Sequence, residues 1–315
     1  MNASLTIDES NYNYIFFDIN PNWQFALKFG YFSISTISII GNLLIIYVVV
    51  SNKRMHNVTN YFITNLALVD IIISVFSTPL QSFVVKSNVL FQAAILQKWI
   101  WMDILCKLGP FSTTLNINVS VLTLVVITLD RFYVIYYPLK PKLRAKHCFV
   151  IISFIWLISI VISSYNLFNY EIKYDPIDPN SNLSINEKHC GLVNENYSKY
   201  HLTLLTLVQF CLPFLIITST SLAIFYQFFF TKTHCPISLG IQNSQLINRK
   251  KVIKMILVVL FVFILCWTPL QIYNILQIVY SEINKFYYVN IMWLIFNMLA
   301  MSNSCYNFII YGFYS

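Results

Sequence analysis

The run Phe29–Val50, FGYFSISTISIIGNLLIIYVVV, contains 22 residues and not one Asp, Glu, Lys or Arg. A helix that crosses a bilayer needs about 20 predominantly apolar residues, so this run is long enough to span a membrane. Six further runs have the same character, and Asp70 is the only charge in them. They are Tyr61–Val85, Leu108–Leu129, Cys148–Asn169, Tyr200–Thr231, Met255–Ser281 and Phe286–Ser315. The sequence therefore predicts an all-α integral membrane protein, a bundle of seven transmembrane helices.

The composition excludes several other classes of protein. Hydrophobic residues make up 57% of the 315 residues and charged residues only 10%, whereas soluble proteins carry about 25% charged residues. A soluble enzyme, a disordered chain and a disulfide-framed secreted module are therefore excluded, and strands of a membrane barrel would alternate over about 10 residues instead of running continuously apolar. We expect residues 1–315 to form one domain.

The charge distribution predicts the orientation. If residues 1–27 lie outside the cell, the inward loops hold twelve of the twenty Lys and Arg residues and one acid, Asp130. Basic residues concentrate in cytoplasmic loops, so the amino terminus is expected outside and the carboxyl terminus in the cytoplasm. The formal net charge of +8 then reflects topology, and we expect no nucleic-acid partner. The longest loops are residues 170–199 outside and 232–249 inside.

Three glycosylation sequons lie on the predicted outer side, at Asn2, Asn182 and Asn196. Glycosylation of Asn-x-Ser/Thr takes place on extracellular segments, so this placement agrees with the predicted topology.

Asp70 is the strongest chemical signal within the apolar runs. A charged residue at bilayer depth costs about 2.5–3.5 kcal/mol on insertion scales and usually marks a functional site. Candidate partners are Ser120, Asn303, Ser304 and Asn307, of which Asn303 and Asn307 share a helical face because they are four residues apart. A carboxylate with hydroxyl and amide oxygens suits a hard cation, and we predict an allosteric sodium site at Asp70, Ser120, Asn303 and Asn307. The alternative is a protonated Asp70 that only holds helices together.

Several motifs follow one another in order along the seven runs. They are Gly41-Asn42, Asn65-Leu66-Ala67-Leu68-Val69-Asp70, Cys106, Asp130-Arg131-Phe132, Trp156, Pro213, Phe263 with Cys266-Trp267-Thr268-Pro269, and Asn307-Phe308-Ile309-Ile310-Tyr311. In this order and spacing the chain resembles the rhodopsin-like G-protein-coupled receptors over nearly its whole length. The resemblance implies a multi-pass plasma-membrane receptor that is not an enzyme. It also implies G-protein coupling and activation through Asp130, Arg131, Phe263, Trp267, Pro269, Asn307 and Tyr311.

The chain departs from this family at three places. Phe308 replaces the proline of the helix-seven motif, and Ser221 stands where the family usually has a tyrosine. The chain also stops at Ser315, directly after the seventh run, so either the sequence is incomplete or the eighth helix and the tail are absent. The resemblance further implies a disulfide between Cys106 and Cys190, the two cysteines on the predicted oxidising side.

The resemblance also narrows the ligand class. Thr113 stands where amine receptors have an Asp, and Phe286–Ser315 has no Lys for retinal, so we predict a peptide ligand. Segments such as Thr59–Leu68 and Cys106–Phe111 resemble the neuropeptide Y and neuropeptide F receptor group, although Ile278 and Asn297 depart from it. Tachykinin-like and RFamide-type receptors are close alternatives. The ligand is expected to contact Thr113, Gln209, Trp267, Asn274 and Asn297.

We expect a peptide and a heterotrimeric G protein as partners, membrane lipids as surroundings, and no cofactor besides the sodium ion. Peptide binding near Trp267 would shift a population of inactive bundles toward active ones and open a cleft around Arg131. A channel, a transporter or a non-signalling heptahelical scaffold are the remaining alternatives. The sequence contains neither H-E-x-x-H, G-x-S-x-G nor a P-loop, so none of these catalytic motifs supports an enzyme.

Overall fold

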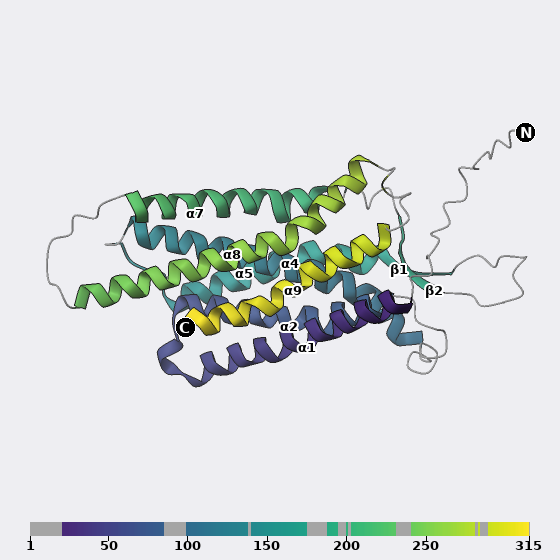
Figure 1. The fold of residues 1–315 in the computed structure, drawn as a ribbon, viewed down its shortest axis with the longest axis horizontal. Helices are drawn as coiled ribbons and strands as arrows, with labels where there is room; N and C mark the ends of the chain where they lie inside the picture. Colours follow the sequence, from purple (N-terminus) through teal and green to yellow (C-terminus); the bar gives the residue numbers. More distant parts are fainter. Residues whose placement is uncertain are drawn as a thin grey trace, which may run out of the picture.

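The computed structural model describes residues 21–84, 99–137, 140–174, 188–194, 200, 203–230, 241–280, 283 and 289–314. Within these residues seven long helices pack side by side as one elongated bundle (Figure 1). They are α1 (Pro21–Ser51), α2 (Val58–Val84), α4 (Trp99–Tyr136), α5 (Ala145–Asn169), α7 (Leu212–Phe230), α8 (Ile241–Val279) and α9 (Val289–Tyr314). Each predicted apolar run lies largely within one of these helices, and the predicted fold class is confirmed.

Six of the described helices have segments that are long and apolar enough to cross a membrane. These are Phe25–Ser51, Val58–Ser77, Cys106–Tyr136, Ala145–Asn169, Thr203–Gln227 and Leu257–Gln277. The seventh, α9, has 26 residues and a length of about 39 Å, which also suffices to span a bilayer. The mean hydropathy of α9 is lower than that of the six spans because α9 carries Asn297, Asn303, Ser304 and Asn307. All four of these side chains are buried within the bundle.

The bundle has apolar side chains on its outer surface, and its interior combines an apolar core with buried polar side chains. Phe32, Phe168 and Leu222 are among many large hydrophobic residues exposed on the helices, as a bilayer environment requires. Buried Ser, Thr and Asn side chains are most numerous in α4 and also occur in α2, α5 and α9. In lipid, such polar groups hold helices together through hydrogen bonds between them.

Two short strands form the one sheet among the described residues. β1 (Tyr170–Tyr174) and β2 (Lys188–Leu192) pair antiparallel, with Ile172 opposite Cys190. They lie within the predicted outer loop 170–199 and at one end of the bundle, which we call the hairpin end (Figure 1). The last turn of α9 lies at the opposite end.

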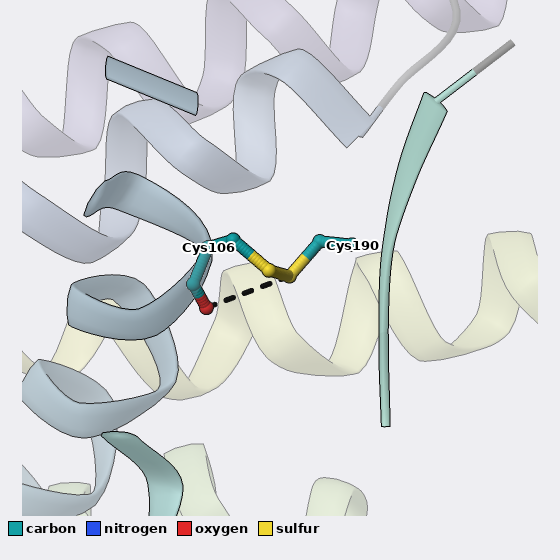
Figure 2. The surroundings of a disulfide bond; sticks show 2 residues. All are labelled: Cys106 and Cys190. Atoms are coloured by element: carbon teal, nitrogen blue, oxygen red, sulfur yellow. Dashed lines mark hydrogen bonds between the residues drawn. A yellow bond between two sulfur atoms is a disulfide. The ribbon is translucent and has the colours of Figure 1, made fainter. Parts of the chain in front are cut away.

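The predicted disulfide is confirmed, because Cys106 near the start of α4 is bonded to Cys190 in β2 (Figure 2). The Cα atoms are 5.6 Å apart and 84 residues apart in sequence. The bond therefore ties the strand pair to α4 at the hairpin end. A disulfide of this kind typically stabilises a fold by about 2–4 kcal/mol.

Two helices extend beyond the predicted apolar runs. Residues 1–27 are predicted to lie outside the cell, and α1 already begins within this segment, at Pro21, because proline is well suited to the first position of a helix. The predicted inner loop 232–249 overlaps α8, which begins at Ile241. Gly240 directly precedes this helix, and no Gly or Pro follows until Pro269, so nothing in the sequence ends the helix at residue 250. The sequons at Asn2, Asn182 and Asn196 lie outside the described residues.

Candidate functional site

Asp70 lies in the centre of the bundle and binds two other helices. Its side chain is 1% exposed, and each of its oxygens accepts hydrogen bonds. Oδ1 accepts from Asn116 Nδ2 in α4 at 3.1 Å and from Ser304 Oγ in α9 at 2.7 Å, and Oδ2 accepts from Asn307 Nδ2 in α9 at 2.8 Å. Asp70 therefore joins α2, α4 and α9, as expected of an acidic residue at bilayer depth.

The hydrogen bonds continue from Asp70 into α1. Asn42 Nδ2 donates to the carbonyl oxygen of Ser304 at 3.2 Å and to that of Ser38 at 2.9 Å. Ser74 Oγ donates to Ser38 Oγ at 2.8 Å and to the carbonyl oxygen of Asp70 at 2.8 Å. Four helices thus share one buried polar network, which links them through side-chain hydrogen bonds.

The structure places only part of the predicted sodium set against Asp70. Asn307 bonds directly to it, while Ser120 and Asn303 are buried but make none of the described hydrogen bonds with Asp70. Asn116 was missed by the sequence analysis. It lies four residues before Ser120, so the helical period places both on one face of α4, and this spacing was the available signal.

The donor set around Asp70 fits a hard cation in its chemistry. Ser304 supplies a hydroxyl oxygen, and the amides of Asn116 and Asn307 present oxygens when they rotate by half a turn about their last torsion. Oxygen ligands of this kind suit small hard cations. Within the described residues no cluster of three or more His, Cys, Asp or Glu side chains forms a transition-metal site.

Arg131 lies near the end of α4 opposite the hairpin. Its Nη2 is 3.2 Å from Asp130 Oδ2, and it also donates a hydrogen bond to the Thr59 hydroxyl at the start of α2. Its Nε atom is buried without a partner. The Asp130–Arg131 pair is therefore attached to α2 through Thr59, a partner that no motif in the sequence indicates.

A hydrogen bond also links α4 to α7 at the end of the bundle where Arg131 lies. Tyr136 in α4 donates a hydrogen bond to the carbonyl oxygen of Ala223 at 3.1 Å. Ser221, two residues away, is partly buried and its hydroxyl has no partner. A tyrosine from α4 thus contacts α7 close to the position where the family has a tyrosine in helix five.

The aromatic pair Phe263 and Trp267 lies in the core of α8. Their ring centroids are 6.0 Å apart, and both residues belong to the main buried apolar cluster together with Leu260 and Tyr311. Pro269 follows within the same helix; it has no N–H to donate to the carbonyl of Leu265, which weakens the helix at that point. The Trp267 Nε1 donor is buried without a partner.

The five predicted ligand residues differ in how free their polar groups are. The Thr113 hydroxyl is already bonded to Ser77 of α2 and to the Gly109 carbonyl. Asn297 Oδ1 accepts from the Tyr31 hydroxyl at 3.2 Å. Gln209 lies in the π-helical turn Leu207–Cys211 and lines a cavity of about 10 Å³ together with Phe263. Asn274 is partly exposed.

Gln209 and Trp267 thus each carry a buried N–H donor without a partner, and Phe263 lies next to both of them. Buried polar atoms are normally hydrogen-bonded, so unpartnered donors of this kind call for an acceptor from elsewhere.

Phe308 leaves α9 an uninterrupted helix at the position where the family has proline. Its ring lies against Gly41 of α1. Tyr311, one turn further along, is buried in the main apolar cluster. The ring of Phe308 therefore lies at the interface of α1 and α9, where it remains partly exposed.

The comparison with known proteins agrees with this arrangement. Residues 41–311 match the family described as 7 transmembrane receptor (rhodopsin family). Over 93% of its length the chain is 31% identical to the substance-P receptor of Aquarana catesbeiana, of which it covers 68%.

Two further relatives carry the names of other peptide receptors. The tachykinin-like peptides receptor 99D of Drosophila melanogaster is 31% identical over 86% of this chain, which covers 51% of that receptor. The neuropeptide FF receptor 2 of Rattus norvegicus is 32% identical over 91% of this chain, which covers 69% of that receptor. The chain thus spans between about half and two thirds of these relatives' own lengths. These relatives do not confirm the predicted neuropeptide Y or neuropeptide F group. Motifs, bundle and relatives together place this chain in the rhodopsin family of seven-transmembrane receptors, among its peptide receptors.

Proposed function

We propose that this protein is a cell-surface receptor that is activated by a tachykinin-like or RFamide-type peptide and signals through a heterotrimeric G protein. The peptide ligand follows from the names of the relatives, and the tachykinin-like and RFamide-type alternatives of the sequence analysis take precedence over the neuropeptide Y type. The proposal places the hairpin end outside the cell and the Arg131 end in the cytoplasm, in agreement with the positive-inside distribution of Lys and Arg.

The observation that carries the proposal is the pair of unpartnered donors at Gln209 and Trp267. Both side chains are buried and neither donor is bonded. A buried donor without an acceptor costs about 1–3 kcal/mol. A peptide supplies acceptors in its backbone carbonyls and in a carboxy-terminal amide, so its binding removes this cost.

The outer segments support a basic peptide. The predicted outer side carries eight Lys residues and ten acids, and the predicted ligand residues are Thr113, Gln209, Trp267, Asn274 and Asn297, none of which is an acid. Surface attraction of this kind accelerates association and weakens with added salt, because charges are screened beyond about 8–10 Å.

Phe263 connects the two residues with unpartnered donors. It lines the same small cavity as Gln209, and its ring contacts the ring of Trp267. Rotation of α8 at Pro269 would move its basic end, Arg249–Lys254, away from Arg131. A ligand that prefers this arrangement shifts the population toward it.

The experiment that tests the ligand class is a panel of synthetic peptides applied to cells that express the receptor with a promiscuous G-protein α-subunit. We expect a response to amidated tachykinin-like or RFamide-type peptides, and a much weaker response to the same peptides as free acids. A response to a neuropeptide Y-type peptide alone would replace the proposed ligand class. Silence toward every peptide, at normal surface expression, would favour a non-signalling scaffold.

We also propose that Asp70 binds sodium in the inactive arrangement. The observation behind it is the convergence of Asn116, Ser304 and Asn307 on its two oxygens.

A further inference from the structure

Tyr31 of α1 is buried and hydrogen-bonded to α9. Its side chain is 0% exposed, and its hydroxyl donates to the carbonyl oxygen of Leu294 at 2.8 Å and to Oδ1 of Asn297 at 3.2 Å. The two acceptors belong to residues three apart in α9, which lie on one face of the helix. Tyr31 therefore binds both the backbone of α9 and a side chain that is predicted to contact the peptide.

These residues lie in the half of the bundle next to the hairpin. α1 and α9 both begin at the hairpin end (Figure 1). Tyr31 is ten residues from the start of α1 and Asn297 is eight residues from the start of α9, which places them about 15 Å and about 12 Å along their helices. Asn297 is thus at a depth that a peptide entering from the hairpin end can reach.

The hydroxyl of Tyr31 determines which atoms of Asn297 are free. An asparagine amide has an oxygen that accepts hydrogen bonds and an NH₂ group that donates them. Oδ1 accepts from Tyr31, whereas Nδ2 makes no hydrogen bond within the part of the chain that the structure describes. The side chain is only 4% exposed, and a half turn of the amide would separate Oδ1 from the donor that it has there. The N–H groups are therefore what Asn297 offers to a ligand.

A donor at Asn297 agrees with the other groups of the ligand site. Gln209 Nε2 and Trp267 Nε1 are buried donors without a partner among the described residues. With Oδ1 of Asn297 held by Tyr31, three of the five predicted ligand residues offer N–H groups. Such a site favours a peptide segment that presents carbonyl oxygens, because buried donors are normally hydrogen-bonded.

We propose that Tyr31 is a positioning residue for the peptide: it orients the Asn297 amide so that the N–H groups, and not the oxygen, meet a carbonyl oxygen of the peptide. This role rests on the proposed function as a peptide receptor and adds a residue outside the five predicted ligand positions. The Tyr31 ring is enclosed in an apolar cluster with Leu27, Ile73 and Leu294, so Tyr31 acts through Asn297 and does not itself touch the peptide.

The test is a double-variant cycle on peptide binding. The probes are a radiolabelled amidated tachykinin-like peptide and a radiolabelled RFamide-type peptide, and the one that the wild type binds more tightly is used throughout. Saturation binding on membranes gives the dissociation constant, which does not depend on how many receptors fold. Binding is also independent of whether the receptor couples to the G protein supplied.

Tyr31→Phe should raise the dissociation constant about threefold to tenfold, the range of one hydrogen bond. In the Asn297→Ala background the same change should raise it by less than about twofold, because the effect of Tyr31 passes through Asn297. Ser35→Ala is the matched control. It removes a hydrogen bond from α1 to the carbonyl oxygen of Ser74 and should bind the peptide like the wild type.

Asn297→Asp tests the donor while Tyr31 stays unchanged. At about pH 8 a carboxyl group is ionised; it still accepts from the Tyr31 hydroxyl but has no N–H. This variant should therefore bind the peptide as weakly as Asn297→Ala does.

Several results would overturn the proposal. An equal loss from Tyr31→Phe in both backgrounds would show that Tyr31 acts through packing and not through Asn297. Binding to Asn297→Asp as tight as to the wild type would show that the oxygen at this position meets the peptide. Unchanged binding in both Tyr31→Phe and Asn297→Ala would exclude the pair from the site while leaving the receptor function intact. A wild type that binds neither peptide would instead overturn the proposed function, and the role of Tyr31 with it.

Discussion

The ring of Phe308 in α9 lies directly on Gly41 in α1, so that a Cβ atom at position 41 would overlap it. A similar contact occurs at Gly30, where a Cβ would lie 2.6 Å from the sulfur of Met298. Glycines thus admit two large side chains of α9 into the surface of α1. Small residues that allow such close approach are typical of helix pairs in membranes.

Gly41→Ala should destabilise the receptor. The added methyl group must displace the Phe308 ring, and overpacking of this kind typically costs about 1–3 kcal/mol. We expect a lower thermal midpoint of the purified receptor in a thiol-dye unfolding assay. Gly312→Ala is the matched control, because a Cβ at Gly312 would meet nothing within 4 Å.

The double variant Gly41→Ala with Phe308→Ala shows whether the contact with the Phe308 ring causes the loss of stability in Gly41→Ala. If the ring is what the methyl group displaces, the double variant should be more stable than the sum of the two single changes predicts. Additive effects, or a Gly312→Ala loss as large as that of Gly41→Ala, would contradict this explanation.

Phe308→Pro should raise basal signalling. Proline removes the backbone donor at position 308 and bends the helix, which makes it easier for Tyr311 to move. A tenfold change in a two-state equilibrium needs only about 1.4 kcal/mol, less than a substitution of this kind can supply. The measurement is ligand-free G-protein activity at matched surface expression, with Phe308→Ala as the control that empties the interface without a bend. Identical basal activity in wild type and Phe308→Pro would show that bending of α9 is not a switch in this receptor.

Thr59→Val should also raise basal signalling. Thr59 accepts a hydrogen bond from Arg131, and residues 241–254 of α8 contain four basic residues and no acid. An ion pair with this end of α8 therefore cannot hold Arg131 in place of Thr59. Hydrogen bonds to charged groups contribute about 1.5–3 kcal/mol, so we expect an increase of several-fold in ligand-free activity.

Thr59→Ser retains the hydroxyl and serves as the control for Thr59→Val. It should behave as the wild type. Equal basal activity of both variants would mean that the Arg131–Thr59 bond does not stabilise the inactive arrangement.

Sodium should stabilise the receptor through Asp70. A ligand that binds only the folded protein raises its free energy of unfolding, so the thermal midpoint should be higher in sodium chloride than in choline chloride at the same ionic strength. In Asp70→Asn this difference should disappear, while Asn116→Ala should reduce it. A salt response of Asp70→Asn equal to that of the wild type would show that Asp70 is only a structural link between helices.

The sequence predicted the helices well because each needs one simple property, an apolar run as long as the bilayer is thick. It also identified Asp70, since one acid stands out in an apolar segment. The residues that form hydrogen bonds with Asp70 and Arg131 were harder to predict. Asn307 was expected from its spacing, but Asn116 and Thr59 reach Asp70 and Arg131 through the relative rotation of helices, which sequence periodicity alone does not determine.

Element ends were predicted less well for a related reason. Apolar runs mark the part of a helix that lies in lipid, whereas α8 continues from its apolar run back to Ile241 through a polar segment without Gly or Pro, in which Gln, Lys and Arg favour helix. The direction of the Phe308 ring also required the structure. Whether it faced lipid or α1 depended on Gly41, which lies far away in sequence and offers space only after the helices have packed.

The most direct test of the receptor function is nucleotide exchange with purified components. The receptor, reconstituted in nanodiscs with a heterotrimeric G protein, is mixed with a labelled non-hydrolysable GTP analogue and an amidated tachykinin-like or RFamide-type peptide. We predict that the peptide accelerates GTP-analogue binding in the wild type, that its free-acid form does so weakly, and that Arg131→Ala abolishes the effect. Folded wild-type receptor that shows no acceleration with any of these peptides, across the main classes of G protein, would contradict the account.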